Sequence, residues 1–112
     1  MTSIGSRRVL AEYSAVGVSK AAIEAVTRYL AVELAAQGII ANCISPGVVL
    51  TDALDWFPSK EAIVQNAVER TPAGRLLTPE DVGELAAWLC SNAAPMIVGQ
   101  TIEIDGGYTL LA

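Results

Sequence analysis

The sequence predicts an α/β fold in which short parallel strands lie between helices. Three observations point to this class. A long helix-forming stretch covers about residues 13–37, a mostly apolar run without alternation at 39–45 follows it directly, and a second strand pattern at 98–104 follows further helix patterns. A strand without polar alternation is typical of a parallel sheet that helices cover on both faces. The 112 residues can hold at most one domain.

The stretch 13–37 has the composition of a long helix that is buried on more than one side. Its sides are kept slim by alanines, and Gly38 follows as a suitable end. We expect one apolar side to lie on the sheet and another to meet a second subunit. The predicted solvent edge is Glu24, Arg28 and Glu33, in which Glu24 and Arg28 are spaced for an ion pair. The predicted apolar stripe is Ile23, Val26, Leu30 and Leu34, with Tyr29 and Val32 on other sides.

The apolar run 39–45 predicts a central strand, which Pro46-Gly47 should end sharply. A helix should follow Ser59 and stop before Thr71-Pro72. The next helix, from Thr78 to about residue 90, has a capping threonine, a proline at its first position and acids in its first turn.

The last predicted strand, 98–104, alternates apolar and polar residues. Asp105-Gly106-Gly107 ends it at a turn that needs the backbone dihedrals open to glycine, and we expect this turn near a subunit contact.

Composition excludes several classes of function. Apolar residues make up 53% and charged residues 17%, which suits a segment of a larger core or of an oligomer. The net charge of −5 disfavours nucleic acid or an anionic membrane as the main partner. No apolar run is long enough to span a membrane, and the first residues lack the apolar core of a signal peptide.

Cysteine and histidine usage predicts a cytoplasmic protein without a metal site. Cys43 and Cys90 do not form a C-x-x-C pair, and we expect both to be small buried residues in a reducing compartment. Trp88 is likewise expected to pack in the core. The chain has no histidine, which excludes histidine triads and histidine-type zinc sites.

Tyr13 and Lys20 are the residues most indicative of function. Seven positions is almost two helical turns, so the phenol and the ammonium share one face. A nearby ammonium favours the phenolate electrostatically, which makes the tyrosine a usable proton donor to a developing oxyanion.

Several segments, taken in order and spacing, resemble the C-terminal half of the short-chain dehydrogenase/reductase family. The six residues between Tyr13 and Lys20 are similar to the enoyl-acyl-carrier-protein reductase branch, and most similar to its type III. The segments that carry the resemblance are SIGSR at 3–7, VGVSK at 16–20, TRYLAVEL at 27–34, PGVVLTDAL at 46–54, TPAGR at 71–75 and GQTIEIDGG at 99–107.

This resemblance implies that residues 1–112 are a single partial domain, the C-terminal half of a doubly wound Rossmann-type parallel sheet fold. The phosphate-binding loop of such folds lies in the first half, and no G-x-G-x-x-G motif occurs in this chain. Met1 would then be an internal methionine of a longer chain, the start of a truncated one, or the true start of a remnant.

The resemblance also implies roles for individual residues. Tyr13 would donate to the substrate oxygen, Lys20 would hold the cofactor ribose and support Tyr13, and Ser3 would place the substrate or the tyrosine; Ser6 could replace Ser3. No metal ligand is implied. The implied cofactor-binding residues are Lys20, Pro46, Gly47, Val48 and Thr51, and the implied substrate-binding lid is Leu54, Trp56 and Phe57, together with Ile63.

The implied activity is reduction of the 2,3-double bond of an enoyl thioester in fatty-acid synthesis. The substrate would be carried by acyl carrier protein or coenzyme A, and the cofactor would be NADPH or NADH, with NADPH favoured. A homotetramer or homodimer would form through helix 13–37 and the last strand. Two alternatives stay open: a reductase of a ketone or alcohol, and a non-catalytic remnant that associates with full-length partners.

Overall fold

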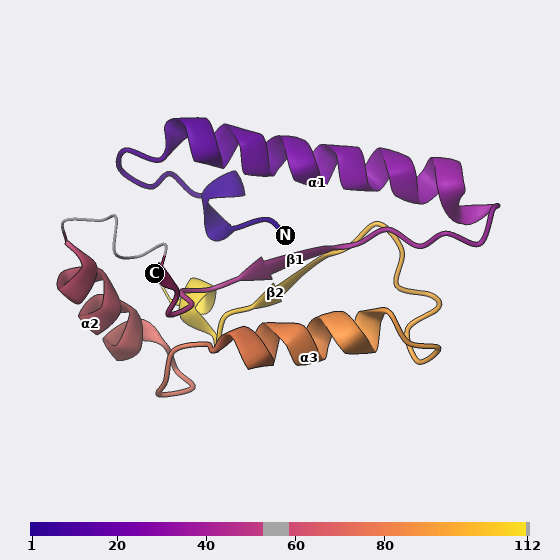
Figure 1. Cartoon of the computed structure of the whole chain (residues 1–112). Coiled ribbons are helices and arrows are strands. Elements are labelled where there is room, and N and C mark those ends of the chain that lie inside the picture. Colours follow the sequence, from indigo (N-terminus) through magenta and orange to yellow (C-terminus); the bar gives the residue numbers. More distant parts are fainter. Residues whose placement is uncertain (53–58, 112) are drawn as a thin grey trace.

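The computed structural model describes residues 1–52 and 59–111, and it has an α/β/α layering (Figure 1). A two-stranded parallel sheet lies between α1 (Ser14–Ala35) on one face and α3 (Pro79–Leu89) on the other. The expected α/β class with a parallel sheet is therefore confirmed. The remaining elements are η1 (Ile4–Ser6), β1 (Cys43–Pro46), α2 (Lys60–Arg70), β2 (Thr101–Ile104) and η3 (Tyr108–Leu110).

Strand β1 has a neighbour on each edge. It pairs in parallel with β2, Cys43 opposite Thr101, and on its other edge the Ile44 carbonyl accepts a hydrogen bond of 2.8 Å from the Thr2 amide. Cys43, Ile44 and Ser45 are all buried. This confirms the prediction of a central strand, which begins four residues later than expected and includes Pro46 as its last residue.

The predicted last strand is also shortened at its start, because a side chain replaces part of the backbone pairing. Asn42 accepts from the Gln100 amide at 2.9 Å and donates to the Ile97 carbonyl at 2.6 Å. Backbone bonds from the Gly99 amide to the Ala41 carbonyl and from the Cys43 amide to the Gln100 carbonyl also hold this segment beside β1, and β2 begins only at Thr101.

Helix α1 packs through a different side from the one that its apolar residues predicted. Its buried residues are Gly17, Glu24 and Ala31, spaced by two turns, whereas Ile23, Val26 and Leu30 are exposed. Small residues allow the closest approach of a helix to its neighbours, so they face inward here. The predicted packing face and the predicted solvent position of Glu24 were therefore wrong.

The two shorter helices start differently. Thr78 and Asp81 form a capping box at the start of α3, as the sequence predicted. Ser59 occupies the N-cap position of α2, but its side chain makes no capping hydrogen bond. Cys90 and Trp88 were expected in the core, but both are exposed at the end of α3.

The turn after β2 has the predicted left-handed dihedrals, with φ of 62° at Gly106 and 89° at Gly107. Burial raises the pKa of the Asp105 carboxyl, but hydrogen bonds from the hydroxyl and amide of Thr109 and from the Gly107 amide outweigh this effect and lower the pKa. A side chain at Gly106 would meet Thr71, so the turn is packed closely against the α2–α3 connection.

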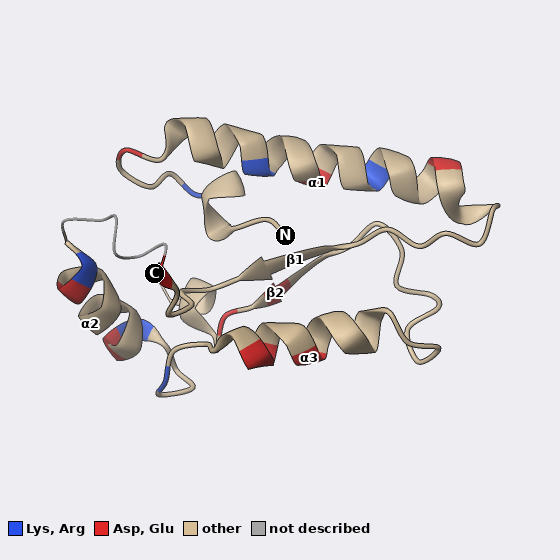
Figure 2. Cartoon of the chain, in the orientation of Figure 1, with Lys and Arg blue, Asp and Glu red and all other residues tan. Residues whose placement is uncertain are grey.

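Along α1 and α2, Lys and Arg positions are interspersed with Asp and Glu positions (Figure 2). Within residues 1–52 and 59–111, no helix could cross a membrane, and no cluster of acidic or cysteine side chains could hold a metal ion.

Candidate active site

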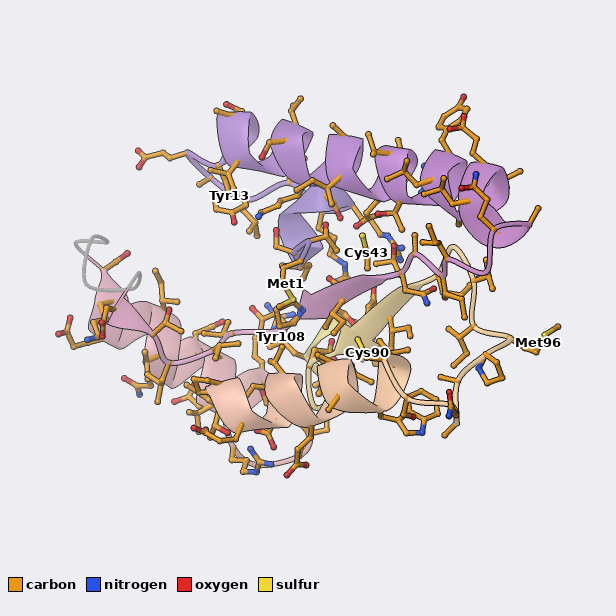
Figure 3. The ribbon with its side chains drawn as sticks, turned by 45° about the vertical axis from the view of Figure 1, so that its right-hand side comes forward. Met1, Tyr13, Cys43, Cys90, Met96 and Tyr108 are labelled. Carbon is orange, nitrogen blue, oxygen red and sulfur yellow. The ribbon has the colours of Figure 1, made fainter. Side chains whose placement is uncertain are left out.

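The candidate site lies at the end of the molecule where the carboxyl ends of β1 and β2 meet the start of α1 (Figures 1 and 3). Tyr13 is the N-cap residue of α1, and Figure 3 shows it at the head of that helix. Glu12, directly before it, has a left-handed backbone with φ of 59°. Ligands of open α/β sheets bind beyond the carboxyl ends of the strands, so this is the expected place for a site.

The Tyr13 ring lies on the backbone of Gly5. A Cβ atom at residue 5 would be 2.5 Å from Cε1 of the ring and 2.6 Å from Cδ1, which leaves no room for any side chain. Residue 17 must also be glycine, because a Cβ atom there would lie 2.7 Å from the Gly5 carbonyl oxygen. The contact surface of the Tyr13 ring on the Gly5 backbone, called the Gly5 seat below, therefore depends on two glycines, Gly5 in η1 and Gly17 in α1.

Three polar groups here have no protein partner in the described part of the chain. The Ser3 hydroxyl is buried without a hydrogen bond, and neither the Tyr13 hydroxyl nor the Lys20 ammonium makes a hydrogen bond or ion pair. Ser3 also lies beside the Gly5 seat, 3.5 Å from the position of a Cβ there. A buried polar group without a partner is unfavourable, and such groups gather at sites that bind ligands.

The choice between Ser3 and Ser6 is informed by what each hydroxyl already does. Ser6 donates to the Ser3 carbonyl and to the Glu24 carboxylate, so its hydroxyl is engaged within the protein. The Ser3 hydroxyl is not engaged. The geometry therefore favours Ser3 over Ser6 as the second hydroxyl of the site.

The segment after β1 is placed at the same edge of the sheet. The Gly47 amide donates to the Ile104 carbonyl at 2.8 Å, and Gly47 packs so closely on Asp105 that a Cβ would lie 2.9 Å from the aspartate Cβ. Pro46 and Val48 are half-buried, and Thr51 is exposed. Ile63 is half-buried in α2, whereas Leu54, Trp56 and Phe57, the predicted lid, lie outside the described residues.

Glu24 is a residue of this region that the sequence did not reveal. Its Oε1 accepts from Thr2 and Ser6, and its Oε2 accepts from Arg7 at 3.3 Å. Burial raises the pKa of this carboxyl, but the hydrogen bonds from Ser6, Thr2 and Arg7 outweigh it and bring the pKa below 4.5. The i, i+4 spacing of Glu24 and Arg28 suggested an ion pair on the surface. The three donor side chains that precede Tyr13 in the sequence were the signal that could have indicated a buried Glu24.

The layering, the parallel strands and the polar groups at their carboxyl edge define a Rossmann-type α/β protein. Residues 1–109 match the family described as enoyl-(acyl carrier protein) reductase, so the chain belongs to this family of short-chain dehydrogenases/reductases. The resemblance drawn from the sequence is therefore confirmed at the level of the family.

Known proteins support this assignment over nearly the whole chain. An enoyl-[acyl-carrier-protein] reductase [NADH] of Bacillus cereus is 37% identical over 111 residues, covering 99% of this chain and 43% of the relative. A tropinone reductase homolog of Arabidopsis thaliana is 37% identical over 110 residues, covering 98% of this chain and 42% of the relative.

Among solved structures, the Bacillus cereus enoyl-acyl carrier protein reductase with NADP+ and indole naphthyridinone has a TM-score of 0.94 and 37% identity, covering 99% of this chain and 43% of its own. The chain thus spans about two fifths of the length of the relatives it matches. This is consistent with a partial Rossmann-type fold.

Proposed function

We propose that this chain forms the catalytic part of an oxidoreductase that reduces the 2,3-double bond of an enoyl thioester carried by acyl carrier protein or coenzyme A. The observation that carries the proposal is a group of three polar side chains at the carboxyl edge of the sheet, Ser3, Tyr13 and Lys20, which have no partner within residues 1–52 and 59–111. Their tyrosine is held by a glycine seat that fixes its ring.

In this proposal Tyr13 donates its proton toward the thioester oxygen. When hydride reaches the β-carbon of the enoyl group, negative charge moves to that oxygen, and a fixed donor stabilises it. Ser3 lies beside the ring and positions the tyrosine or the substrate. Lys20, two turns further along α1, holds the cofactor ribose and supports Tyr13.

The residues present fit a nicotinamide cofactor, NADPH or NADH, which supplies the hydride when it is bound. The unpartnered Lys20 ammonium is suited to ribose hydroxyls. Pro46 ends β1, and Gly47, Val48 and Thr51 follow it at the edge where such folds bind nucleotides. A Bacillus cereus relative is named for NADH, and the solved Bacillus cereus structure is titled with NADP+, so both names support a nicotinamide.

We also propose that α1 and β2 take part in oligomer contacts. Val18, Tyr29 and Val32 are each more than two thirds exposed on α1, which is unusual for apolar side chains of a soluble helix. Strand β2 pairs on one edge only within the described residues. A homodimer or homotetramer would cover both surfaces. Residues 1–112 are then one partial domain, in the cytoplasm by the sequence argument above.

The test is a comparison of Tyr13→Phe and Lys20→Met with the unaltered protein, in the natural polypeptide that carries residues 1–112. With crotonyl-coenzyme A, Tyr13→Phe should lower kcat by about 10²–10⁴-fold and leave cofactor affinity unchanged. Lys20→Met should weaken both. Tyr108→Phe, in η3, keeps the ring over which Arg70 lies and is the matched control; it should be neutral.

The outcomes separate the alternatives. Near-normal turnover of the Tyr13→Phe variant would remove Tyr13 from the mechanism. Faster reduction of acetoacetyl- than crotonyl-coenzyme A would favour a ketone reductase, the alternative to which the tropinone reductase homolog lends support. Absence of any saturable change in tryptophan fluorescence on titration with NADPH or NADH would favour a non-catalytic remnant.

A further inference from the structure

The segment from Thr2 to Arg8 is attached to four different parts of the protein. The Thr2 amide bonds to β1, and the Arg8 guanidinium donates to the Thr109 carbonyl in η3. The Arg7 guanidinium bridges Glu24 on α1 at 3.3 Å and Glu103 on β2 at 3.2 Å. Figure 1 shows this segment lying between α1 and the sheet. Within the described residues, only the Glu24 carboxylate accepts hydrogen bonds from three side chains of this segment, those of Thr2, Ser6 and Arg7.

The Glu24 carboxylate contacts residues on both sides of Ser3 and Gly5. Its Oε1 atom accepts from Thr2 at 2.9 Å and from Ser6, the residues that flank the Ser3–Gly5 turn, and its Oε2 atom accepts from Arg7. The Thr2 hydroxyl also lies 3.3 Å from the Lys20 carbonyl. One buried side chain therefore ties the turn to the helix that carries Tyr13 and Lys20.

This arrangement fixes the distance between two of the three unpartnered groups. Ser3 and the Gly5 seat lie within the turn, whereas the Tyr13 ring comes from the start of α1. Nothing else within the described residues bonds side chain to side chain from this turn to α1, apart from the donors to Glu24. If the carboxylate is removed, the turn keeps its backbone bonds and the bond from the Thr2 hydroxyl to the Lys20 carbonyl, but it loses the three side-chain bonds that tie Thr2, Ser6 and Arg7 to α1.

We propose that Glu24 is a positioning residue that holds Ser3 and the Gly5 seat against Tyr13 for the reduction. The inference rests on the proposed function. Glu24 does not contact the substrate; it acts through Ser3 and through the seat of the tyrosine ring. The charge is required, because three donors converge on it and a neutral amide offers one acceptor oxygen and a competing NH2 donor.

The experiment uses Glu24→Gln in the natural polypeptide that carries residues 1–112, with Glu33→Gln, at an exposed carboxylate of the same helix, as the matched control. We expect kcat for crotonyl-coenzyme A to fall about 10- to 100-fold, as for a catalytic group displaced by up to 1 Å, with cofactor affinity unchanged. Glu33→Gln should leave both values unchanged. An unchanged kcat in the Glu24→Gln variant would overturn the proposal.

A double-mutant cycle with Ser3→Ala separates positioning from general destabilisation. If Glu24 acts through Ser3, the loss from Glu24→Gln should be much smaller once Ser3 is already alanine. If Glu24→Gln lowered kcat by the same factor in the unaltered protein and in the Ser3→Ala variant, Glu24 would not act through Ser3. Ser6→Ala, which removes only one of the three donors, should give a smaller loss in the same direction and covers the case in which Glu24→Gln does not fold.

Amide hydrogen exchange gives a readout that does not depend on activity. The amides of Ser6, Arg7 and Arg8 bond within the turn, and in Glu24→Gln or Ser6→Ala they should exchange at least about tenfold faster. The Cys43 and Gly47 amides of the sheet should be unchanged. The proposal would be overturned if the amides of the turn and of the sheet exchanged faster by the same factor, or if the exchange of the turn amides did not change. An unaltered protein that reduces no enoyl thioester would instead refute the proposed function, and the exchange comparison would still decide the role of Glu24.

Discussion

Replacing Gly5 by alanine tests whether the Tyr13 ring is held where the structure places it. The added methyl would lie 2.5 Å from the nearest ring carbon, and ordinary van der Waals contact begins at 3.4 Å. To relieve this overlap, the ring or the turn has to retreat by about 0.9 Å. The Gly5 backbone needs no left-handed dihedral, so the substitution acts through this contact and not through backbone strain.

The expected loss follows from that displacement. A misplacement of about 1 Å at a reacting group can lower a rate about 10²-fold. This corresponds to about 2.7 kcal/mol of transition-state stabilisation. We expect the loss in kcat for crotonyl-coenzyme A. Cofactor affinity should change little, because the methyl group at residue 5 meets the Tyr13 ring and does not meet Lys20, the residue assigned to the cofactor.

The assay is steady-state reduction of crotonyl-coenzyme A, followed at the absorbance of the reduced cofactor, with urea unfolding of the same samples. Gly83→Ala is the matched control, since Gly83 lies in α3 and nothing lies within 4 Å of its Cβ position. It should keep full activity and gain up to about 1 kcal/mol of stability from helix propensity. A Gly5→Ala variant with unaltered turnover would refute the reasoning, because the ring could not then rest on Gly5 in the active protein.

Three further predictions concern the fold. Thr78→Ala should lower the free energy of unfolding by about 1 kcal/mol through loss of the capping box, whereas Ser59→Ala, without a capping bond to lose, should change it by less than about 0.5 kcal/mol in urea unfolding. Because hydrogen bonds hold the folded-state pKa of Glu24 below the ordinary value of a glutamate, its stabilisation is present above that ordinary value and is lost as the pH falls through the folded pKa. The stability difference between the unaltered protein and Glu24→Gln, from urea midpoints, should therefore shrink as the pH falls below the ordinary pKa of a glutamate, and a widening difference would contradict the sign. Residues 1–112 expressed by themselves should associate, because apolar side chains of α1 are exposed; a monodisperse 11.7 kDa species in light scattering would show otherwise.

The class of fold and the order of its elements were predictable because they depend on local patterns. The mostly apolar run before Pro46 indicated a buried parallel strand, and the Thr78 to Asp81 sequence indicated a capped helix start. The strand boundaries were less predictable. Asn42 replaces ladder bonds with side-chain bonds to a segment more than 50 residues away, which no local pattern specifies.

The packing side of α1 was not predictable from its apolar residues. Those residues mark what a helix can bury, and in this chain they form the exposed side, while Gly17, Glu24 and Ala31 are buried. Glu24 in particular becomes favourable inside only because Thr2, Ser6 and Arg7 converge on it. For the candidate site, Ser3, Tyr13 and Lys20 were identified from the sequence, but the Gly5 seat depends on a contact between separate elements.

The register of the sheet has a consequence for how the chain is made. Cys43 pairs with Thr101, so the two strands lie 58 positions apart in the sequence. During translation β1 must wait for those residues to be synthesised, which takes about 3–12 s at ribosomal rates of 5–20 residues per second. For that time an apolar strand has a free edge, the state from which chains aggregate most readily. Efficient production of this protein should therefore respond to translation speed and to chaperones that shield nascent apolar segments.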